Sequence, residues 1–279
     1  MKKRIFSLLL VFCLAVPALF LGGCQKSLNV NEVLGVCGDA LKNTFEHVLT
    51  DKTDLSTHKN VTMTKTVLSE EYDDAGVLET STTVVKTYQR KGNGLDTVYV
   101  ETTQTTTKNY EEGELLEEEV TVQKDIYTKI VTSGVTTYHK LTEYTNADNE
   151  TTKYVGATYT ESLFLTTVYN LSEDVMDEIA DLYPGTELVL IVSIAEFEAK
   201  GNDQEGKFEL SYALSEYYNG RIQETKMNGS MEYKDAKIAN GSSRNERYYN
   251  GILNDVEEES TVVEYSSEIT APTSLEDYV

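Results

Sequence analysis

Three cysteines are the residues in this 279-residue sequence best suited to covalent chemistry, because a thiolate is a strong nucleophile. Cys13 lies inside an apolar N-terminal run. Cys37 lies on the apolar stripe of a predicted helix, where a free thiol behaves as a small hydrophobic side chain. Cys24 directly follows Gly22 and Gly23, and small residues at this point let a chain enter a peptidase site. Cys24 is therefore the candidate for modification.

The histidines and the acidic clusters do not form a known catalytic or metal-binding motif. His47, His58 and His139 lack metal-ligand spacing, and the acidic clusters lack the offsets of a calcium loop. The sequence has no glycine-rich phosphate loop, no G-x-S-x-G and no CxxC. We therefore predict no enzyme activity, no metal and no cofactor, with a hydrolase built on an unidentified Ser or Thr as the last alternative. The acidic clusters, interpreted as solvated turns and strand edges, lie at 70–71, 73–74, 111–112, 117–119 and 257–259.

The segment before Cys24 has the pattern of an export signal. Basic residues at 2–4 precede an apolar run over 5–21. A charged start, a short apolar core and small residues before a cleavage point are typical of a secretory signal. The run is also short for a transmembrane helix, which needs about 20 residues. The end of this segment, Leu21-Gly22-Gly23-Cys24, resembles the lipobox of bacterial lipoproteins.

This resemblance implies a diacylglyceryl group on the Cys24 thiol and cleavage just before it. Residues 1–23 would then be the lipoprotein signal peptide, and 24–30 the lipidated N-terminus with a short tether. Acyl chains such as palmitate hold a protein on a membrane because each buried methylene contributes about 0.8 kcal/mol. We expect a protein that is lipid-anchored at the cell membrane on the extracytoplasmic side. An ordinary signal peptide with an accidental cysteine is the alternative.

The composition limits the partners. Without residues 1–23 the chain keeps 21 basic and 47 acidic residues, a net charge of −26. Such a surface repels phosphate backbones, so we predict no nucleic-acid partner. We expect a monomer that contacts the membrane through the lipid on Cys24. After lipidation only Cys37 remains free, so no internal disulfide is available.

The pattern of the mature chain predicts mainly β structure. The 19 tyrosines against 7 phenylalanines and no tryptophan, with many Thr and Val, suit half-exposed sheet. Alternating apolar residues and short turns at 75–76, 92–94, 112–113, 133–134 and 219–220 indicate an antiparallel meander. The predicted strands are 58–72, 77–90, 96–108, 115–132, 135–145, 151–160, 186–199, 205–218, 221–234 and 259–269.

Two segments have helical periodicity. Apolar residues recur at spacings of three and four over 31–49, with Asn31 as the expected N-cap. A second helix is predicted over 171–183, capped by Ser172 and ended by Pro184. The following residues, 188–194, are apolar on both faces, which predicts a central strand.

Together these elements predict a mainly β, α+β fold: a large curved antiparallel sheet, or unclosed half-barrel, covered by the two helices. Residues 31–279 would form a single β-rich domain, apolar on just one face of its sheet. The order of elements, with the C-terminal run 265–272, resembles the LolA/LppX-like lipoprotein-carrier superfamily. The resemblance implies an unclosed barrel with a helical lid and an apolar cavity that holds acyl chains.

Two functions remain open. The first is a non-enzymatic protein that binds a lipid or another apolar small molecule in a cavity between sheet and helices. The second is a cell-surface interaction or structural lipoprotein that contacts protein or glycan through its Tyr/Thr-rich sheet face. A solid core is the alternative to the cavity. The candidate ligand-binding residues are Phe45, Leu163, Phe164, Met176, Ile179, Leu182, Leu210, Tyr212 and Leu214.

Overall fold

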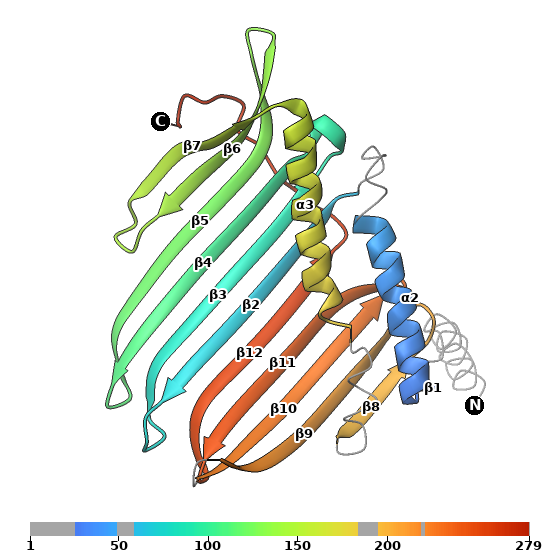
Figure 1. Ribbon diagram of the computed structural model, residues 1–279, viewed down its shortest axis with the longest axis vertical. Helices are drawn as coiled ribbons and strands as arrows, with labels where there is room; N and C mark the ends of the chain where they lie inside the picture. The colour runs from blue at the N-terminus through green and yellow to red at the C-terminus, as the bar shows by residue number, and fades with distance from the viewer. Residues whose placement is uncertain (1–25, 49–58, 184–194, 219–220, 279) are drawn as a thin grey trace, which may run out of the picture.

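The computed structural model describes residues 26–48, 59–183, 195–218 and 221–278. These residues form one antiparallel twelve-stranded sheet with two long helices on one of its faces (Figure 1). The strand order is β1-β8-β9-β10-β11-β12-β2-β3-β4-β5-β6-β7. The strands are β1 (Lys26–Ser27), β2 (Val61–Tyr72), β3 (Leu78–Lys91), β4 (Val98–Glu111), β5 (Glu114–Thr132), β6 (Val135–Thr145), β7 (Thr151–Tyr159), β8 (Glu196–Gly201), β9 (Gly206–Tyr218), β10 (Arg221–Lys234), β11 (Lys237–Tyr249) and β12 (Ile252–Glu264).

Most of the predicted strands are confirmed. The six predictions from 58–72 to 151–160 match β2 to β7 with ends that differ by at most three residues, and 205–218 and 221–234 match β9 and β10. Tight turns with positive φ at Glu112, Gly113 and Gly134 join neighbours, as the sequence indicates. The predictions at 188–194 and at 219–220 lie outside the described residues.

The prediction of one strand over 259–269 is wrong. Strands β11 and β12 occupy 237–264, and the segment after Glu264 is irregular. The middle stretches of β11 and β12, 239–247 and 254–261, are mostly polar on both faces, and this removes the apolar alternation by which a strand is recognised. The acidic clusters at 117–119 and 257–259 therefore lie within strands rather than in turns. Cross-strand cations stabilise them, as in the contact from Arg244 to Glu258 at 2.9 Å.

The first helix, α2 (Val30–Val48), is confirmed, but its cap differs. Asn29, not Asn31, accepts a hydrogen bond from the Glu32 backbone N–H at 3.1 Å, and Glu32 accepts one from the Asn29 N–H at 2.9 Å. This reciprocal pair is a capping box. Residues Val33, Cys37 and Ala40 are buried, so Cys37 lies in the core as its position on the apolar stripe predicts.

The second helix, α3 (Glu161–Ala180), begins ten residues before the predicted start. Thr160 is the N-cap, and its side chain accepts a hydrogen bond from the Leu163 N–H at 3.3 Å. The prediction of Ser172 as the cap is wrong. Ser172 is buried in the middle of the helix, where its hydroxyl donates to the Val168 carbonyl at 3.0 Å. A serine that bonds back in this way does not end a helix.

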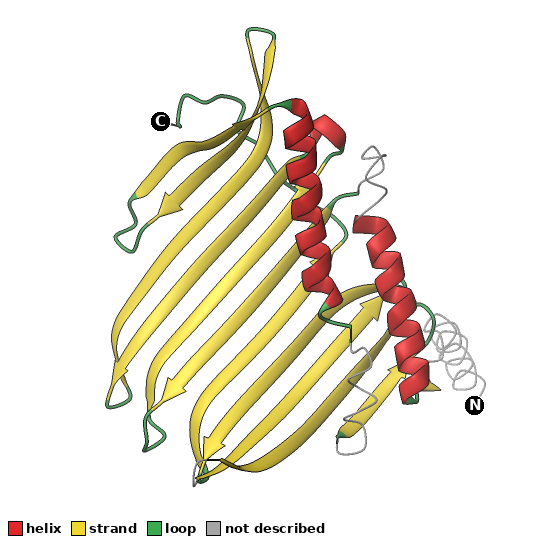
Figure 2. Ribbon diagram, in the orientation of Figure 1, coloured by secondary structure: helices red, strands yellow, loops and turns green. Residues whose placement is uncertain are grey.

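Both helices lie on the same face of the sheet (Figure 2). Helix α2 packs over β11, and α3 packs over β6, β7 and the short 3-10 helix η2 (Gly94–Asp96). The core between helices and sheet includes Cys37, Met63, Tyr99, Phe164 and Ile179, all of which are at most 1% exposed. The expected covering of one sheet face by two helices is therefore confirmed. No described helix has the length and apolar character needed to cross a bilayer.

The opposite face carries a second, smaller core, so the expectation that only one face is apolar is wrong. Val100, Ile126 and Leu141 alternate along their strands with residues of the helix side and therefore point away from the helices. The C-terminal segment covers them, and its Tyr278 donates a hydrogen bond to Glu143 at 2.8 Å. The C-terminal segment therefore shields this second core from solvent.

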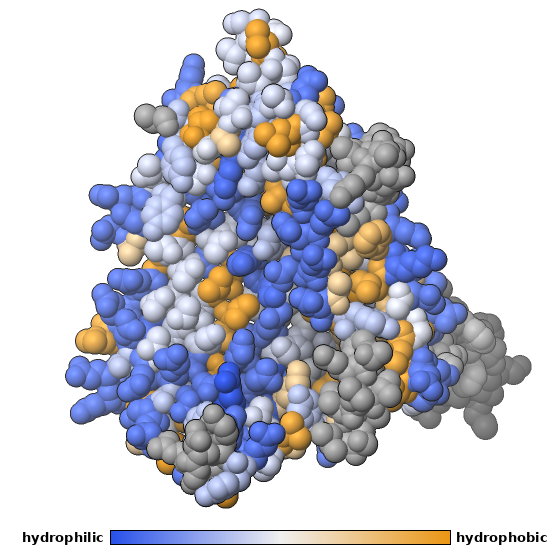
Figure 3. All heavy atoms as spheres, viewed as in Figure 1, coloured by the Kyte–Doolittle hydropathy of each residue, from blue (hydrophilic) through white to orange (hydrophobic). Residues whose placement is uncertain are grey.

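The helices cover only one end of their face. Beyond them the face is mainly polar, as the blue and white surface in Figure 3 shows. Threonines at alternate positions of β4, Thr103, Thr105 and Thr107, lie there, and Thr107 is paired directly with Thr82 of β3. A sheet half-covered in this way does not enclose a continuous apolar interior.

Candidate functional site

The nine predicted ligand-binding residues do not share one cavity in the described part of the chain. Phe164, Met176 and Ile179 are buried side chains of the main core, and Leu182 and Leu210 pack against that core. Exposed positions are taken by Phe45, Leu163 and Leu214, and Tyr212 is partly buried on β9. The five packed side chains support the solid-core alternative.

A hollow of about 370 Å³ does lie between α3 and the sheet, and it is polar. Burial, followed by the nearby Asp125 carboxylate, raises the pKa of Glu101. Burial and neighbouring carboxylates likewise raise the pKa of Asp174. Acyl chains do not suit such walls, because buried carboxyl groups need polar partners. The lining residues are Tyr88, Tyr99, Glu101, Leu171, Asp174, Asp177, Glu178 and Asp181.

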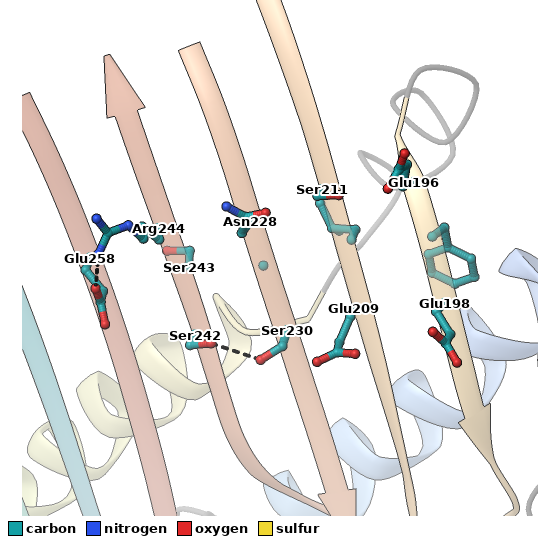
Figure 4. Close-up of a pocket in the computed structure, with 13 residues that line it drawn as sticks. Glu196, Glu198, Glu209, Ser211, Asn228, Ser230, Ser242, Ser243, Arg244 and Glu258 are labelled. Carbon is teal, nitrogen blue, oxygen red and sulfur yellow. Dashed lines mark hydrogen bonds and ion pairs between the residues drawn. The ribbon is translucent and has the colours of Figure 1, made fainter. Parts of the chain in front are cut away.

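A hollow of about 610 Å³ lies on the outer face of the sheet, across strands β8 to β12 (Figure 4). We call it the outer-face hollow. Figure 4 shows its labelled side chains in front of the strands, with both helices behind them. It is lined by Glu196, Phe197, Glu198, Glu209, Leu210, Ser211, Asn228, Gly229, Ser230, Ser242, Ser243, Arg244 and Glu258.

The strand register places most of these side chains in two parallel rows, because directly paired residues share a face. One row is Glu196–Ser211–Asn228–Arg244–Glu258, and the other is Glu198–Glu209–Ser230–Ser242. Strand β10 contributes only Asn228, Gly229 and Ser230, whereas the flanking strands carry charged side chains beside their serines or in place of them. Ser230 and Ser242 hydroxyls lie 2.9 Å apart, which ties β10 to β11 across the floor.

Ion pairs neutralise much of the charge around the outer-face hollow. Arg244 donates to Glu246 and to Glu258, each at 2.9 Å, and these hydrogen bonds raise the pKa of Arg244. Lys200 pairs with Glu198, and Lys207 pairs with Glu209 at 2.6 Å. The floor therefore offers hydroxyl and amide groups between partly neutralised walls.

The arrangement suits noncovalent recognition. Serine hydroxyls both donate and accept hydrogen bonds, and the Asn228 amide has two donors and an acceptor. Within the residues that the structure describes, no group of three or more His, Cys, Asp or Glu side chains is placed to hold a metal. His139 is buried away from the hollow, between the hydroxyls of Thr137 and Thr158.

Sequence reasoning did not find the outer-face hollow. Its floor combines residues such as Ser211, Asn228 and Ser242, which are 14 or more positions apart and meet only through strand pairing. One of the strands, β11, was not predicted at all. The signal present in the sequence was the polar stretch 239–247, with serines at 242 and 243 between Gly241 and Arg244.

No protein-family model matches the sequence, and no curated protein matches it. The resemblances to the lipobox and to the LolA/LppX-like superfamily therefore remain predictions.

Proposed function

We propose that this chain is a lipid-anchored, non-enzymatic binding protein that holds a hydroxyl-rich ligand of the glycan class on the outer face of its sheet. The observation that carries this proposal is the outer-face hollow of about 610 Å³, with its floor of Ser and Asn side chains. A volume of this order falls within the range of small-molecule sites.

Sugar hydroxyls both donate and accept hydrogen bonds, as the floor does. Ser211 of β9 lies directly opposite Asn228 of β10, and Ser230 of β10 lies opposite Ser242 of β11, so the spacing of the hydrogen-bonding groups across the sheet follows the strand separation of about 4.8 Å. A ligand that crosses the strands would therefore meet a new polar group at each strand. An acyl chain could not satisfy these groups, and leaving polar groups desolvated costs about 1–3 kcal/mol each.

The charge around the site sets a preference among glycans. Four glutamates line the outer-face hollow, and Arg244, Lys200 and Lys207 each pair with one of them, which leaves a net negative charge. A carboxylated or sulfated sugar would be repelled, whereas a neutral or amino sugar would not. We expect neutral or amino-bearing oligosaccharides to bind and acidic ones to be excluded.

The proposed anchor lies close to this part of the sheet. Cys24 is two positions before Lys26, which pairs with Gly201 of β8, and β8 also carries Glu196 and Glu198. A tether of two residues spans at most about 7 Å. The lipid would thus hold the β1–β8 edge near the bilayer, where envelope glycans are available on the extracytoplasmic side.

An apolar ligand between helices and sheet has less support. In the described residues the space there is taken by core side chains such as Phe164 and Ile179, and the hollow of about 370 Å³ between α3 and the sheet is walled mainly by carboxyl groups. Native mass spectrometry of the purified protein separates the two functions. A co-purifying fatty acid or lipid would favour the apolar site, and its absence would favour the glycan proposal.

The direct test is binding to an array of neutral, amino-bearing and acidic oligosaccharides. We expect Asn228→Leu, which fills the floor, to weaken binding by about tenfold or more, which corresponds to about 1.4 kcal/mol. Thr106→Leu is the matched control, because Thr106 lies on the same sheet face outside the hollow. Equal binding by both variants, or preference for acidic sugars, would contradict the proposal.

A further inference from the structure

Four neighbouring pairs of strands end side by side at the end of the sheet that is free of both helices (Figure 1). The pairs are β9 with β10, β11 with β12, β2 with β3, and β4 with β5, and these eight strands are consecutive in the sheet. We call this end the hairpin rim and define it by its exposed apolar side chains. They are Val77, Leu115, Leu116, Tyr217, Ile222 and Ile252.

Contacts between the turns make the hairpin rim continuous. Asn250 of the β11–β12 turn accepts a hydrogen bond from the Ile222 N–H at 3.1 Å. The Ile252 side chain reaches Gly76 of the next turn, where a Cβ would lie only 3.3 Å from its Cγ2. The Val77 side chain likewise lies beside Gly113, where a Cβ would be 3.6 Å from its Cγ1. The rim is thus one connected surface.

The three turns of the hairpin rim that the structure describes are also held in fixed conformations. Asp73 accepts hydrogen bonds from the Ala75 and Val77 N–H groups, each at 2.8 Å. Glu112 and Asn250 adopt positive φ, as tight two-residue hairpins require. A surface fixed in this way loses little conformational entropy when a partner binds.

The apolar side chains of the hairpin rim are strongly exposed. Leu116 is 68% exposed, Tyr217 78% and Ile222 56%. Single exposed apolar residues are common on protein surfaces, but a group of them rimmed by polar residues marks an interaction site. Tyrosine is among the side chains that supply most of the binding energy when they are buried at the centre of a contact, and burial of leucine, isoleucine and valine adds a hydrophobic contribution for each side chain.

The charge around the apolar side chains of the hairpin rim is mainly negative. Residues 70–79 include five acidic and no basic side chains, and residues 108–119 include six acidic and one basic. Such a surface attracts a basic partner and repels an anionic bilayer or nucleic acid. The exposed apolar side chains of the hairpin rim add contacts that a purely electrostatic encounter lacks.

The hairpin rim also faces away from the proposed tether. Lys26 pairs with Gly201 beside the β8–β9 turn, and β9 runs from that turn toward the rim over 13 residues. At about 3.4 Å per residue, the rim lies roughly 40 Å from the tether along the strands. The statement that the rim faces away from the membrane rests on the proposed anchoring at Cys24. The charge and the exposed apolar side chains of the hairpin rim do not depend on that anchoring.

We propose that the hairpin rim is a docking surface for a protein partner whose contact face is basic and partly apolar. The rim spans eight strands, or about 34 Å, which matches the width of a protein contact rather than that of a small ligand. It is separate from the outer-face hollow, so the two sites can be tested independently.

The test uses the chain purified from its host in a mild non-ionic detergent, with three synthetic peptides as probes. One contains Lys and Leu, one has the same charge with Gly in place of Leu, and one has Glu in place of Lys. Fluorescence anisotropy at physiological salt gives the dissociation constants. We expect the Lys/Leu peptide to bind at least about tenfold more tightly than either of the others.

Rim and control variants then locate the binding. Val77→Ser combined with Leu116→Ser should weaken the Lys/Leu peptide by about tenfold. Val131→Ser combined with Val135→Ser changes two exposed valines on the β5–β6 hairpin and should leave the affinity for the Lys/Leu peptide unchanged. If the rim variant fails to fold, Glu114→Lys with Glu117→Lys serves instead and should also weaken binding. Both rim variants should keep the oligosaccharide binding of the parent chain.

Three results would overturn the proposal. Equal effects of the rim and control variants would place the binding elsewhere. Equal affinity for the Lys/Leu and Lys/Gly peptides would show a charge effect without a docking surface. Stronger binding to anionic lipid vesicles than to the peptides would identify a membrane contact instead.

Discussion

The buried guanidinium of Arg90 donates a hydrogen bond from Nη1 to the Ser172 hydroxyl at 2.8 Å, and this contact joins β3 to α3. Arg90 is only 1% exposed and donates a second bond to the Lys59 carbonyl at 2.6 Å. Burial lowers the pKa of Arg90 to about 10. Ser172 therefore serves the helix–sheet contact rather than the start of a helix.

The first prediction concerns this contact. Ser172→Ala should destabilise the folded protein by about 1–3 kcal/mol, because it leaves a buried charged donor without its acceptor. Chemical denaturation measures the free energy of unfolding. Ser162→Ala, at an exposed position of the same helix, is the control and should change it by less than about 0.5 kcal/mol. A negligible effect of Ser172→Ala would mean that Arg90 is stabilised by other groups.

The second prediction concerns the C-terminal cover of the outer face. Tyr278→Ala should destabilise the protein by about 3–5 kcal/mol, because it opens the apolar cluster of Val100, Ile126 and Leu141. Tyr278→Phe keeps the ring and loses only the hydrogen bond to Glu143, so it should cost about 1 kcal/mol. Thermal and chemical unfolding separate the two variants. Equal effects would show that the ring does not contribute to the core.

The Glu143 carboxyl adds a pH dependence to this contact. Although burial itself raises its pKa, hydrogen bonds from Tyr278 and Lys153 outweigh that effect and lower it. A carboxyl group with a lowered folded-state pKa stabilises the protein above its unfolded pKa and loses that contribution as the pH falls. Glu143→Gln should therefore reduce the loss of stability on acidification below about pH 5.

The third prediction concerns Glu101, whose effect on stability changes with pH in the opposite direction to that of Glu143. The pKa of Glu101 beside α3 is raised, so its charged form opposes folding. This unfavourable contribution is present at neutral pH and disappears as the pH falls through the folded-state pKa. Glu101→Gln should stabilise the protein at pH 7 and have a smaller effect at pH 4. A destabilising effect at pH 7 would show that the carboxylate has a favourable partner.

The fourth prediction concerns the anchor. Cells grown with an alkyne-tagged palmitate should incorporate the tag into the parent chain, and Cys24→Ala should abolish the label. Cys13→Ala changes the other cysteine of the N-terminal segment and should keep the label. Labelling that survives Cys24→Ala would rule out the lipobox interpretation.

The fold was more predictable than the site, and the missed elements show why. Helix α2 and most strands carry a regular apolar period, so one face of each can be read from the sequence. The first half of α3 is rich in residues such as Thr166 and Thr167, which usually favour strands. In the structure their hydroxyls donate to the carbonyls of Ser162 and Leu163, one turn earlier, and the helix continues.

The outer-face hollow could not be predicted, because it depends on strand pairing. Asn228 and Arg244 lie 16 residues apart, yet the register places them directly opposite each other. Polar residues on both faces of β11 remove the alternation by which a strand is recognised. The contact between β12 and β2, which joins the two halves of the sheet, likewise leaves no local pattern in the sequence.

Backbone hydrogen exchange, measured with and without a neutral or amino-bearing oligosaccharide selected on the array, tests the central claim most directly. We predict slower exchange in β9, β10 and β11 around Ser211, Asn228 and Ser242, with no change at α3. Protection confined to α3 and the strands beneath it, or protection by a fatty acid in place of the oligosaccharide, would contradict the account.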